Sequence, residues 1–337
     1  MTTIKVIAQE AGVSKATVSL ALNDKPGVAP HIRQRILEIA KRLNYQPNAS
    51  ARGLALQKTQ TLGVIVPDIS GPFYAELVRG VGEESRAHDY YLTLCTTIGR
   101  PSRERMYFQL LGEQRVDGII VVSPRNDEAL ICQIHAEGFP LVVVDRDIQA
   151  SDKIVEVIVD NFHGALAGVE HLIGLGHRRI GFINGPPEIQ ATQDRLRGYQ
   201  LALREHRITP EDRWICVGDF RKEGGYRCMQ ELLSIKPPLE AIFTANDLMA
   251  IGAIKAIREA GKRVPDDIAI VGFDDIPLAA HFDPSLTTVR QPVARMGAVA
   301  CRLLLQEING EEILECKAIL QTELIVRASS GTQEGGD

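Results

Sequence analysis

The first sixty residues carry apolar side chains at the spacing of short amphipathic helices. A first helix of two turns has four apolar positions: Val6, Ile7, Ala8 and Ala11. Gly12 interrupts the pattern where a tight turn needs a glycine, and Ser14 offers a hydroxyl as the N-cap of a second helix. That helix turns three apolar residues back towards the first: Val18, Ala21 and Leu22. The pattern predicts a helix-turn-helix.

A third helix follows after a short loop. Pro30 suits the first helical position, because proline's fixed backbone angle fits there and its missing N–H costs no bond. We expect the helix to run to about Asn44, with apolar residues at Ile32, Ile36, Ile39, Ala40 and Leu43. Three such helices can enclose a minimal core.

From Thr61 onward, short apolar runs alternate with amphipathic stretches, as in parallel strands joined by crossover helices. We predict ten strands: Leu62–Pro67, Tyr91–Thr96, Gly118–Ser123, Leu141–Asp145, Val155–Asp160, Arg179–Asn184, Trp214–Gly218, Ala241–Thr244, Ile268–Phe273 and Thr287–Gln291. Ten strands are too many for one simple doubly wound sheet. We therefore expect an α/β body with two sheets of five or six strands, dividing near Asp160.

Charge separates the two parts of the chain. Residues 1–60 carry nine Lys or Arg and three acids, a net charge of +6, whereas the remainder carries −11. A basic end on an acidic body indicates a polyanionic partner for that end. A solvated basic surface is the alternative.

In a helix-turn-helix, the second helix enters the DNA major groove and its side chains reach base edges. Lys15, Ala16 and Leu20 project away from the internal face and are candidates for that contact. Small hydrogen-bonding residues suit phosphates, which fix the register without reading the sequence: Ser14, Thr17, Ser19 and Asn23. An ordinary three-helix packing unit is the alternative.

Two segments, Ala11 to Ser19 with Asn23 and then Asn44 to Leu54, resemble the signature of the lactose-repressor (LacI/GalR) family. The resemblance extends over nearly the whole chain. It implies that Lys15, Ala16 and Leu20 read bases, and that Asn48 to Leu54 form a hinge helix inserting Leu54 into the minor groove. The implied DNA contacts are Ser14, Lys15, Ala16, Thr17, Ser19, Leu20, Asn23, Tyr45, Asn48, Ala51, Arg52 and Leu54.

Two positions depart from the family pattern. The position of Leu20 usually holds a polar side chain such as Arg or His, so contact with a thymine methyl can replace a guanine contact. Gly53 replaces a commoner serine, and glycine lowers helix stability by up to about 1 kcal/mol relative to alanine. We expect a hinge helix that depends more on DNA to fold.

The resemblance also implies an N-terminal headpiece followed by a two-lobed sensor of the periplasmic-binding-protein type. The expected divisions are a headpiece at 1–47, a hinge and linker at 48–60, a sensor at 61–330 and a disordered tail at 331–337. The first lobe holds about 61–160 and 290–320, and the second about 161–288 and the C-terminal strand. The chain is expected to cross between lobes near Asp160, Thr288 and Gln321.

Ligands of open parallel sheets bind beyond the carboxyl ends of the strands, so polar strand-end residues should line a cleft between the lobes. Carboxylates and a guanidinium there suit a polyhydroxylated ligand, whose hydroxyls both donate and accept. Phe73 or Tyr74, together with Phe220, can cover its C–H faces. The resemblance adds Gln291, so the candidate ligand contacts are Phe73, Asp145, Arg146, Arg195, Phe220, Asn246, Asp274 and Gln291. For Asp247 and Asp275 we favour structural roles.

Signals of catalysis and of metal binding are missing. Gly80-Val81-Gly82 lies inside a predicted amphipathic helix and lacks the third glycine of a dinucleotide loop, and no G-x-S-x-G elbow occurs. The six cysteines form no C-x-x-C pair, and we expect them to be reduced. We therefore expect no enzyme, cofactor or metal, and no signal peptide or membrane helix directs the chain away from the cytoplasm.

The sequence thus predicts a DNA-binding, ligand-responsive transcriptional regulator, a repressor of a carbohydrate utilisation operon. One helix-turn-helix offers few base contacts, so we expect a homodimer on a palindromic operator. We expect a small effector: a sugar, a sugar acid or a sugar phosphate, with a purine or nucleoside as the alternative. A binding protein for transport would need export and no DNA module, so this alternative is not favoured.

Overall fold

The computed structural model describes residues 3–22, 24–45, 58–113, 115–125 and 128–331, and the chain forms two compact units, Met1–Thr59 and Gln60–Asp337. Among the described residues, no helix combines the length and apolar character needed to cross a bilayer.

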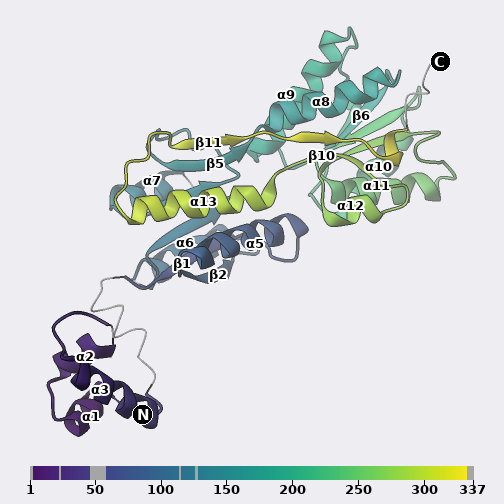
Figure 1. The fold of residues 1–337 in the computed structure, drawn as a ribbon. Coiled ribbons are helices and arrows are strands. Elements are labelled where there is room, and N and C mark those ends of the chain that lie inside the picture. The colour runs from purple at the N-terminus through teal and green to yellow at the C-terminus, as the bar shows by residue number, and fades with distance from the viewer. Residues whose placement is uncertain (1–2, 23, 46–57, 114, 126–127, 332–337) are drawn as a thin grey trace. The chain divides into compact units, whose positions relative to one another are not determined.

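The N-terminal unit consists of three helices around a small core (Figure 1). They are α1 (Ile4–Ala11), α2 (Lys15–Leu22) and α3 (Pro30–Arg42). Gly12 ends α1 in the left-handed conformation with φ 66°, and the backbone N–H of Thr17 donates to the Ser14 hydroxyl at 3.1 Å, as the predicted cap requires. One expectation is wrong: Val6 is 43% exposed, because the buried face of α1 follows the spacing of Ile7, Ala8 and Ala11.

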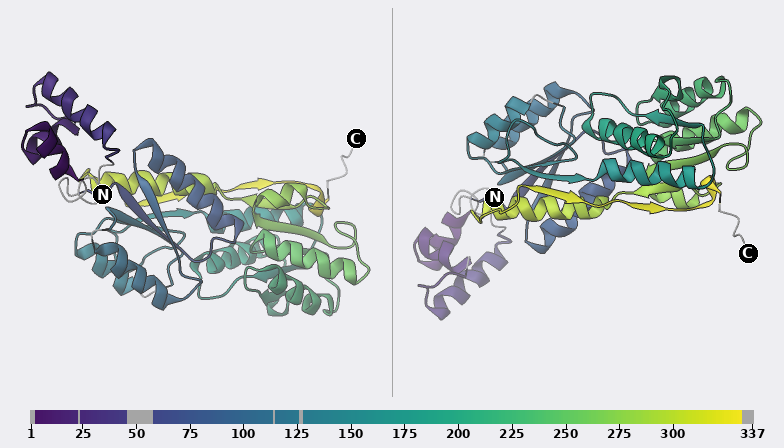
Figure 2. Two further views of the ribbon diagram at one scale, coloured as in Figure 1. Left: turned by 90° about the horizontal axis from the view of Figure 1, so that it is seen from below. Right: turned by 90° about the horizontal axis from the view of Figure 1, so that it is seen from above.

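The larger unit has two lobes, each built around a six-stranded sheet (Figures 1 and 2). The first-lobe elements are β1 (Thr61–Val66), α5 (Pro72–Ala87), β2 (Tyr91–Thr96), α6 (Pro101–Gly112), β3 (Gly118–Val122), α7 (Glu128–Ala136), β4 (Leu141–Val144), β5 (Val155–Val159), α13 (Val293–Ile308) and β11 (Lys317–Leu320). Their strands are ordered β11-β5-β4-β3-β1-β2. Helices α5 and α13 cover one face of the sheet, and α6 and α7 cover the other.

The second lobe repeats this architecture. Its elements are α8 (Asn161–Gly174), β6 (Ile180–Asn184), α9 (Gln190–Glu205), η1 (Asp212–Trp214), β7 (Ile215–Val217), α10 (Lys222–Leu233), β8 (Ala241–Thr244), α11 (Asp247–Glu259), β9 (Ala269–Asp274), α12 (Pro277–His281), β10 (Thr287–Arg290), β12 (Glu323–Ile325) and η2 (Ala328–Ser330). The strand order is β12-β10-β9-β8-β6-β7, and α8 and α9 lie on the opposite face from α10 and α11 (Figure 1). Only the pair of β10 with β12 is antiparallel among the described strands.

All ten predicted strands are present, with ends within two residues of those expected, and they divide between two sheets after β5 as predicted. Strands β11 and β12, of four and three residues, were not predicted from apolar runs, although the resemblance placed a C-terminal strand in the second lobe. The crossing expected near Thr288 occurs later, after Arg290. Strand β10 stays paired with β9 up to the register pair of Arg290 and Asp274.

The cysteine expectation needs a correction. Cys216 on β7 and Cys228 on α10 form a disulfide, with their Cα atoms 5.5 Å apart. The sequence could not show this, because twelve residues and a change of element separate the two. The other four are free: Cys95 and Cys301 are buried, and Cys132 and Cys316 are partly exposed.

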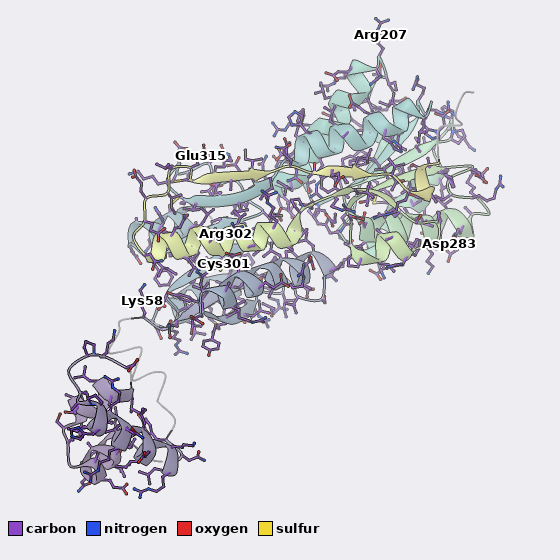
Figure 3. The ribbon with its side chains drawn as sticks, in the orientation of Figure 1. Lys58, Arg207, Asp283, Cys301, Arg302 and Glu315 are labelled. Carbon is purple, nitrogen blue, oxygen red and sulfur yellow. A yellow bond between two sulfur atoms is a disulfide. The ribbon has the colours of Figure 1, made fainter. Side chains whose placement is uncertain are left out.

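Helices α5 and α13 approach each other at two glycines. A Cβ atom at Gly80 would overlap the carbonyl oxygen of Ala294, and one at Gly297 would overlap the carbonyl oxygen of Leu77. Arg302 of α13 is labelled in Figure 3, and its Nε lies 3.4 Å from the carboxylate of Glu84 on α5. The Gly80 segment thus lies inside a helix, as expected, and the structure shows that Gly80 serves the packing of that helix against α13.

This packing predicts opposite effects for two glycines of α5. Gly80→Ala should lower the free energy of unfolding by about 1–3 kcal/mol, because the backbone of α13 cannot give way easily. Gly82→Ala, the matched control, should raise it by up to about 1 kcal/mol, because its nearest neighbour would be the Leu92 side chain at 3.6 Å. Urea unfolding measures both free energies, provided that the dependence of the unfolding free energy on urea concentration is the same in all variants. Equal effects of the two substitutions would contradict the close approach.

Candidate functional site

The N-terminal unit presents one face of α2 to solvent. Lys15, Ala16 and Leu20 are exposed, Leu20 by 38%, whereas Val18 and Ala21 are buried against the other helices. The three residues expected to read bases are therefore free to meet a groove.

The smaller polar residues beside this face are partly engaged already. The Ser14 and Thr17 hydroxyls lie 2.9 Å apart, Ser19 is half-exposed, and Tyr45 packs against the headpiece core. Five expected DNA contacts lie outside the described residues: Asn23, Asn48, Ala51, Arg52 and Leu54, as does Gly53.

Arg195 is one of the two most deeply buried of the eight candidate ligand contacts: it and Gln291 each have 4% of their surface exposed. Arg195 lies on the buried face of α9, with its guanidinium carbon 3.8 Å from the centre of the Phe273 ring. Its Nε donates to the side-chain oxygen of Asn161 at 2.9 Å, and Nη1 donates to the carbonyl oxygen of Ala245. Burial lowers the pKa of Arg195, and nearby carboxylates led by Asp274 and Asp145 oppose that shift.

Asp274 ends β9 beside this guanidinium. Its Oδ1 accepts a hydrogen bond from the Gln291 amide at 2.7 Å. Burial raises the pKa of Asp274 to about 7, although Arg195 and Gln291 favour the charged form. The side-chain oxygen of Gln291 is buried and has no hydrogen-bond partner among the described residues, so it can accept a bond from a ligand.

Asp145 reaches the site from the first lobe. It follows β4 in the left-handed region, with φ 61°, and accepts a 2.6 Å hydrogen bond from the Ser123 hydroxyl. Burial raises the pKa of the Asp145 carboxyl, with Ser123 and Arg195 acting against the shift. Burial, together with the charge of Asp145, also raises the pKa of Tyr74 to about 12, which keeps that phenol neutral. Carboxylates from both lobes thus face one buried guanidinium.

Asn246 and Phe220 are joined to each other. The Asn246 amide donates to the Phe220 carbonyl at 3.1 Å, and its side-chain oxygen accepts from the Met249 backbone N–H at 2.9 Å. Asn246 therefore caps α11 and fixes the loop that carries Phe220. The Phe220 ring packs so closely on Gly185, at the end of β6, that a Cβ there would overlap it.

Arg146 is not brought into this cluster. Its Nη1 donates to the Pro124 carbonyl at 2.8 Å, and Nη2 lies 3.4 Å from the Glu128 carboxylate. Adjacent residues after a strand point to different sides, so Asp145 and Arg146 could not both be assigned to the cleft from the sequence.

A cleft of about 300 Å³ opens beside Asp274 and Gln291. Phe73, from the start of α5, lines it from the first lobe, and Ile276 and Pro277 line it from the second. Three of the eight candidates, Phe73, Asp274 and Gln291, therefore line one cavity.

The structure adds residues that the sequence analysis did not name as ligand contacts. The Thr192 hydroxyl is fully buried without a hydrogen-bond partner among the described residues. Thr192 lies three residues before Arg195, so helical spacing could have placed both on one face. Ser123 and Asn161 follow β3 and β5, at the strand ends where ligands of such sheets bind.

Two family descriptions match the chain. One, bacterial regulatory proteins of the lacI family, matches residues 3–48. The other, a periplasmic binding protein-like domain, matches residues 169–330. The first corresponds to the three-helix unit, and the second to most of the second lobe with α13 and the C-terminal segment.

Similar proteins match along nearly the whole chain. The HTH-type transcriptional repressor PurR of Edwardsiella ictaluri (strain 93-146) is 38% identical over 313 residues, 92% of each chain. A structure of the transcriptional regulator CelR in complex with cellobiose has a TM-score of 0.76 and 33% identity, covering 98% of this chain and 100% of that one. The Lac repressor dimer bound to operator and the anti-inducer ONPF has a TM-score of 0.89 and 28% identity, covering 98% and 99%. The resemblance stated from the sequence is confirmed, and the chain belongs to the LacI family of bacterial transcriptional regulators.

Proposed function

We propose that this regulator is a repressor of a carbohydrate utilisation operon, and that an uncharged polyhydroxylated effector, a sugar or sugar derivative, controls its binding to a palindromic operator. The observation that carries the effector class is the placement of Asp145 and Asp274 around the buried Arg195. Carboxylates are hydrogen-bond acceptors, so they favour a ligand that presents several hydroxyl donors.

The charges of the site make an anionic effector less favourable. Arg195 already donates to Asn161 and Ala245, and Arg146 donates to Pro124. A sugar acid or sugar phosphate would add negative charge beside two carboxylates in a poorly solvated cleft. A neutral ligand adds none, and the aromatic ring of Phe73, which lines the cleft, could cover an apolar sugar face.

Known relatives support this effector class and keep one alternative. In one similar structure, the regulator CelR is in complex with cellobiose, which is a neutral sugar. The similarity to PurR keeps a purine or nucleoside as the second candidate, and a flat base could stack on Phe73 or Phe220. A thermal-shift screen against neutral sugars, sugar acids, sugar phosphates, purines and nucleosides separates these classes, because ligand at ~100 times its dissociation constant stabilises by about 2.7 kcal/mol.

The DNA side of the proposal rests on the exposed face of α2. Lys15, Ala16 and Leu20 would read bases in the major groove, and Ser14, Thr17 and Ser19 would contact phosphates. Insertion of Leu54 into the minor groove remains part of the proposal, with Asn23, Tyr45, Asn48, Ala51 and Arg52 as further contacts.

We predict that Arg195→Ala and Asp274→Ala leave operator affinity intact and weaken the effector response. Each removes a charged hydrogen-bonding group, a loss of about 1.5–3 kcal/mol in effector affinity. Arg197→Ala is the matched control, because Arg197 lies on the same helix but is exposed and forms an ion pair with Asp194. Gel shifts with operator DNA, with and without the strongest screening hit, measure both properties. An unchanged effector response in Arg195→Ala and Asp274→Ala would remove the cleft from the proposal.

We also propose a homodimer formed through the first lobe, near the helices at 72–88 and 101–115. Strand β2 is an edge strand, and apolar side chains stand exposed on it and on α6: Tyr91, Leu94, Met106 and Leu110. Exposed apolar side chains gathered on neighbouring elements favour an association surface there. The same two-fold pairing would place two headpieces on the two halves of a palindrome.

This dimer surface predicts the effect of a charge at its centre. Met106→Asp should shift the protein from dimer to monomer at micromolar concentration and lower operator affinity about tenfold or more, because a buried charge opposes association. Val217→Asp, at an equally exposed apolar position on the second lobe, is the control and should change neither. Sedimentation velocity and footprinting measure the two effects. A Met106→Asp protein that remains dimeric would place the interface elsewhere.

A further inference from the structure

Two consecutive aspartates at the end of β9 have an unusual backbone. Asp274 has φ 111° and Asp275 has φ 56°, both in the region that side chains other than glycine rarely adopt. Such a conformation persists only where the surroundings hold it in place. The turn directs the Asp274 carboxylate to the Gln291 amide, so whatever holds this backbone also aims Asp274.

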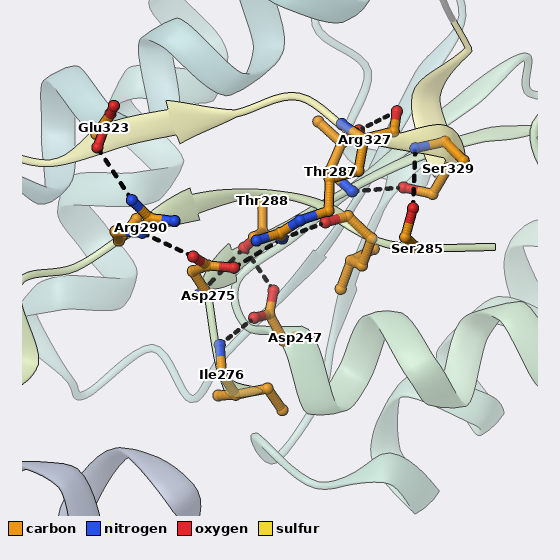
Figure 4. A network of polar contacts seen from close by, with 12 residues as sticks. Asp247, Asp275, Ile276, Ser285, Thr287, Thr288, Arg290, Glu323, Arg327 and Ser329 are labelled. Carbon is orange, nitrogen blue, oxygen red and sulfur yellow. Dashed lines mark hydrogen bonds and ion pairs between the residues drawn. The ribbon is translucent and has the colours of Figure 1, made fainter. Parts of the chain in front are cut away.

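Asp275 supplies an anchor for this turn (Figure 4). Its Oδ2 lies 2.7 Å from Nε of Arg290, and its Oδ1 lies 2.7 Å from Nη1 of Arg327. Only 8% of its side chain is exposed, so the two ion pairs are well shielded from water. Both carboxylate oxygens are therefore engaged by guanidiniums from outside the turn.

The backbone on the other side of the turn is also tied. The N–H of Ile276 donates to Oδ2 of Asp247 at 2.9 Å, and Oδ1 of Asp247 accepts from the Thr288 hydroxyl at 2.6 Å (Figure 4). Gly272, in the middle of β9, leaves the room that this carboxylate occupies. Asp247 and Asp275 thus have the structural roles expected from the sequence.

Adjacent residues of one segment hold the two aspartates. Arg290 binds Asp275, and the next residue, Gln291, binds Asp274. The chain leaves the second lobe at this point, and Arg290 also lies 3.4 Å from Glu323 on β12. The ion pair of Asp275 with Arg290 therefore fixes the Asp274 turn against the end of β10, where the chain passes to the first lobe.

We propose that Asp275 is a positioning residue, whose ion pairs with Arg290 and Arg327 hold the 274–275 turn and thereby keep the Asp274 carboxylate aimed into the effector cleft. The inference rests on the proposed role of Asp274 in that cleft. It assigns to Asp275 a function beyond a surface ion pair: without it, the turn relaxes and Asp274 moves towards solvent.

The test uses the pH dependence of stability, which reports where Asp274 lies without any effector. The pKa of Asp274 in the folded chain, about 7, lies above its ordinary value of 3.8, so stability is lost as pH rises through about 7. The charged or titratable groups that face it are Arg195 on α9, Asp145 after β4, Asp247 on α11 and Tyr74 on α5. Glu156, whose pKa burial also raises to about 7, lies in the first lobe and cancels in a comparison of variants.

The experiment compares Asp274→Asn in four backgrounds of the full chain: parent, Asp275→Asn, Arg290→Gln and Glu323→Gln. In each background, urea unfolding gives the ratio of the unfolding equilibrium constants at pH 8 and pH 5. In the parent, Asp274→Asn should reduce that ratio about tenfold or more, since one pKa unit corresponds to a factor of ten. In Asp275→Asn the reduction should fall below about twofold, and in Arg290→Gln it should be intermediate.

Glu323→Gln is the matched control, because Glu323 is exposed and contacts Arg290 but not Asp275, and it should preserve the parent's value. The same reduction in all four backgrounds would overturn the proposal. If Asp275→Asn does not fold, Arg290→Gln decides: an undiminished effect of Asp274→Asn there overturns the inference. Failure of the proposed function would give a different result. Asp274→Asn would then keep a full effector response on operator DNA, while the pH dependence of stability would still differ between the backgrounds as predicted.

Discussion

The buried guanidinium of Arg195, on α9 of the second lobe, constrains the residues around it. Removing a charge from water costs several kcal/mol unless neighbours replace the lost hydration, so Arg195 must be surrounded by acceptors and opposite charge. The second lobe supplies the Asn161 and Ala245 oxygens and the face of Phe273. Asp145 adds a carboxylate from the first lobe, and Asp274 adds one from the second. The interaction therefore ties together residues at the ends of strands in both lobes.

The proposed effector site and the crossing between lobes share residues, and this would give the chain a means of response. Gln291 bonds Asp274 and directly follows the last residue of β10, where the chain passes to the first lobe. A ligand that prefers one arrangement of the lobes shifts the population towards it, in proportion to its difference in affinity for the two states. In the proposed dimer, such a shift would alter the spacing of the first lobes and so the fit of the paired headpieces to DNA.

The sequence predicted the architecture well because apolar periodicity reports burial directly. All ten apolar runs predicted as strands form strands, whereas β11 and β12, of four and three residues, were not predicted from apolar runs. The site was predicted only in part: strand-end position led to Asp145 and Asp274, but it could not tell that Arg146 turns to Pro124 or that Asn246 caps a helix. The left-handed turn at Asp275 and the Cys216–Cys228 disulfide depend on distant partners, which local sequence does not reveal.

In the proposed regulator, a ligand in the cleft beside Asp274 and Gln291 and an operator on the α2 face bind one chain with a shared coupling free energy. Thermodynamic linkage requires that the effector change operator affinity by the same factor as the operator changes effector affinity. The direct measurement is a pair of titrations on the full-length protein at fixed salt: operator binding with and without the strongest effector, and effector binding with and without saturating operator. We predict equal factors, on the order of 5–150. Effector binding in the cleft that leaves operator affinity unchanged would contradict the account.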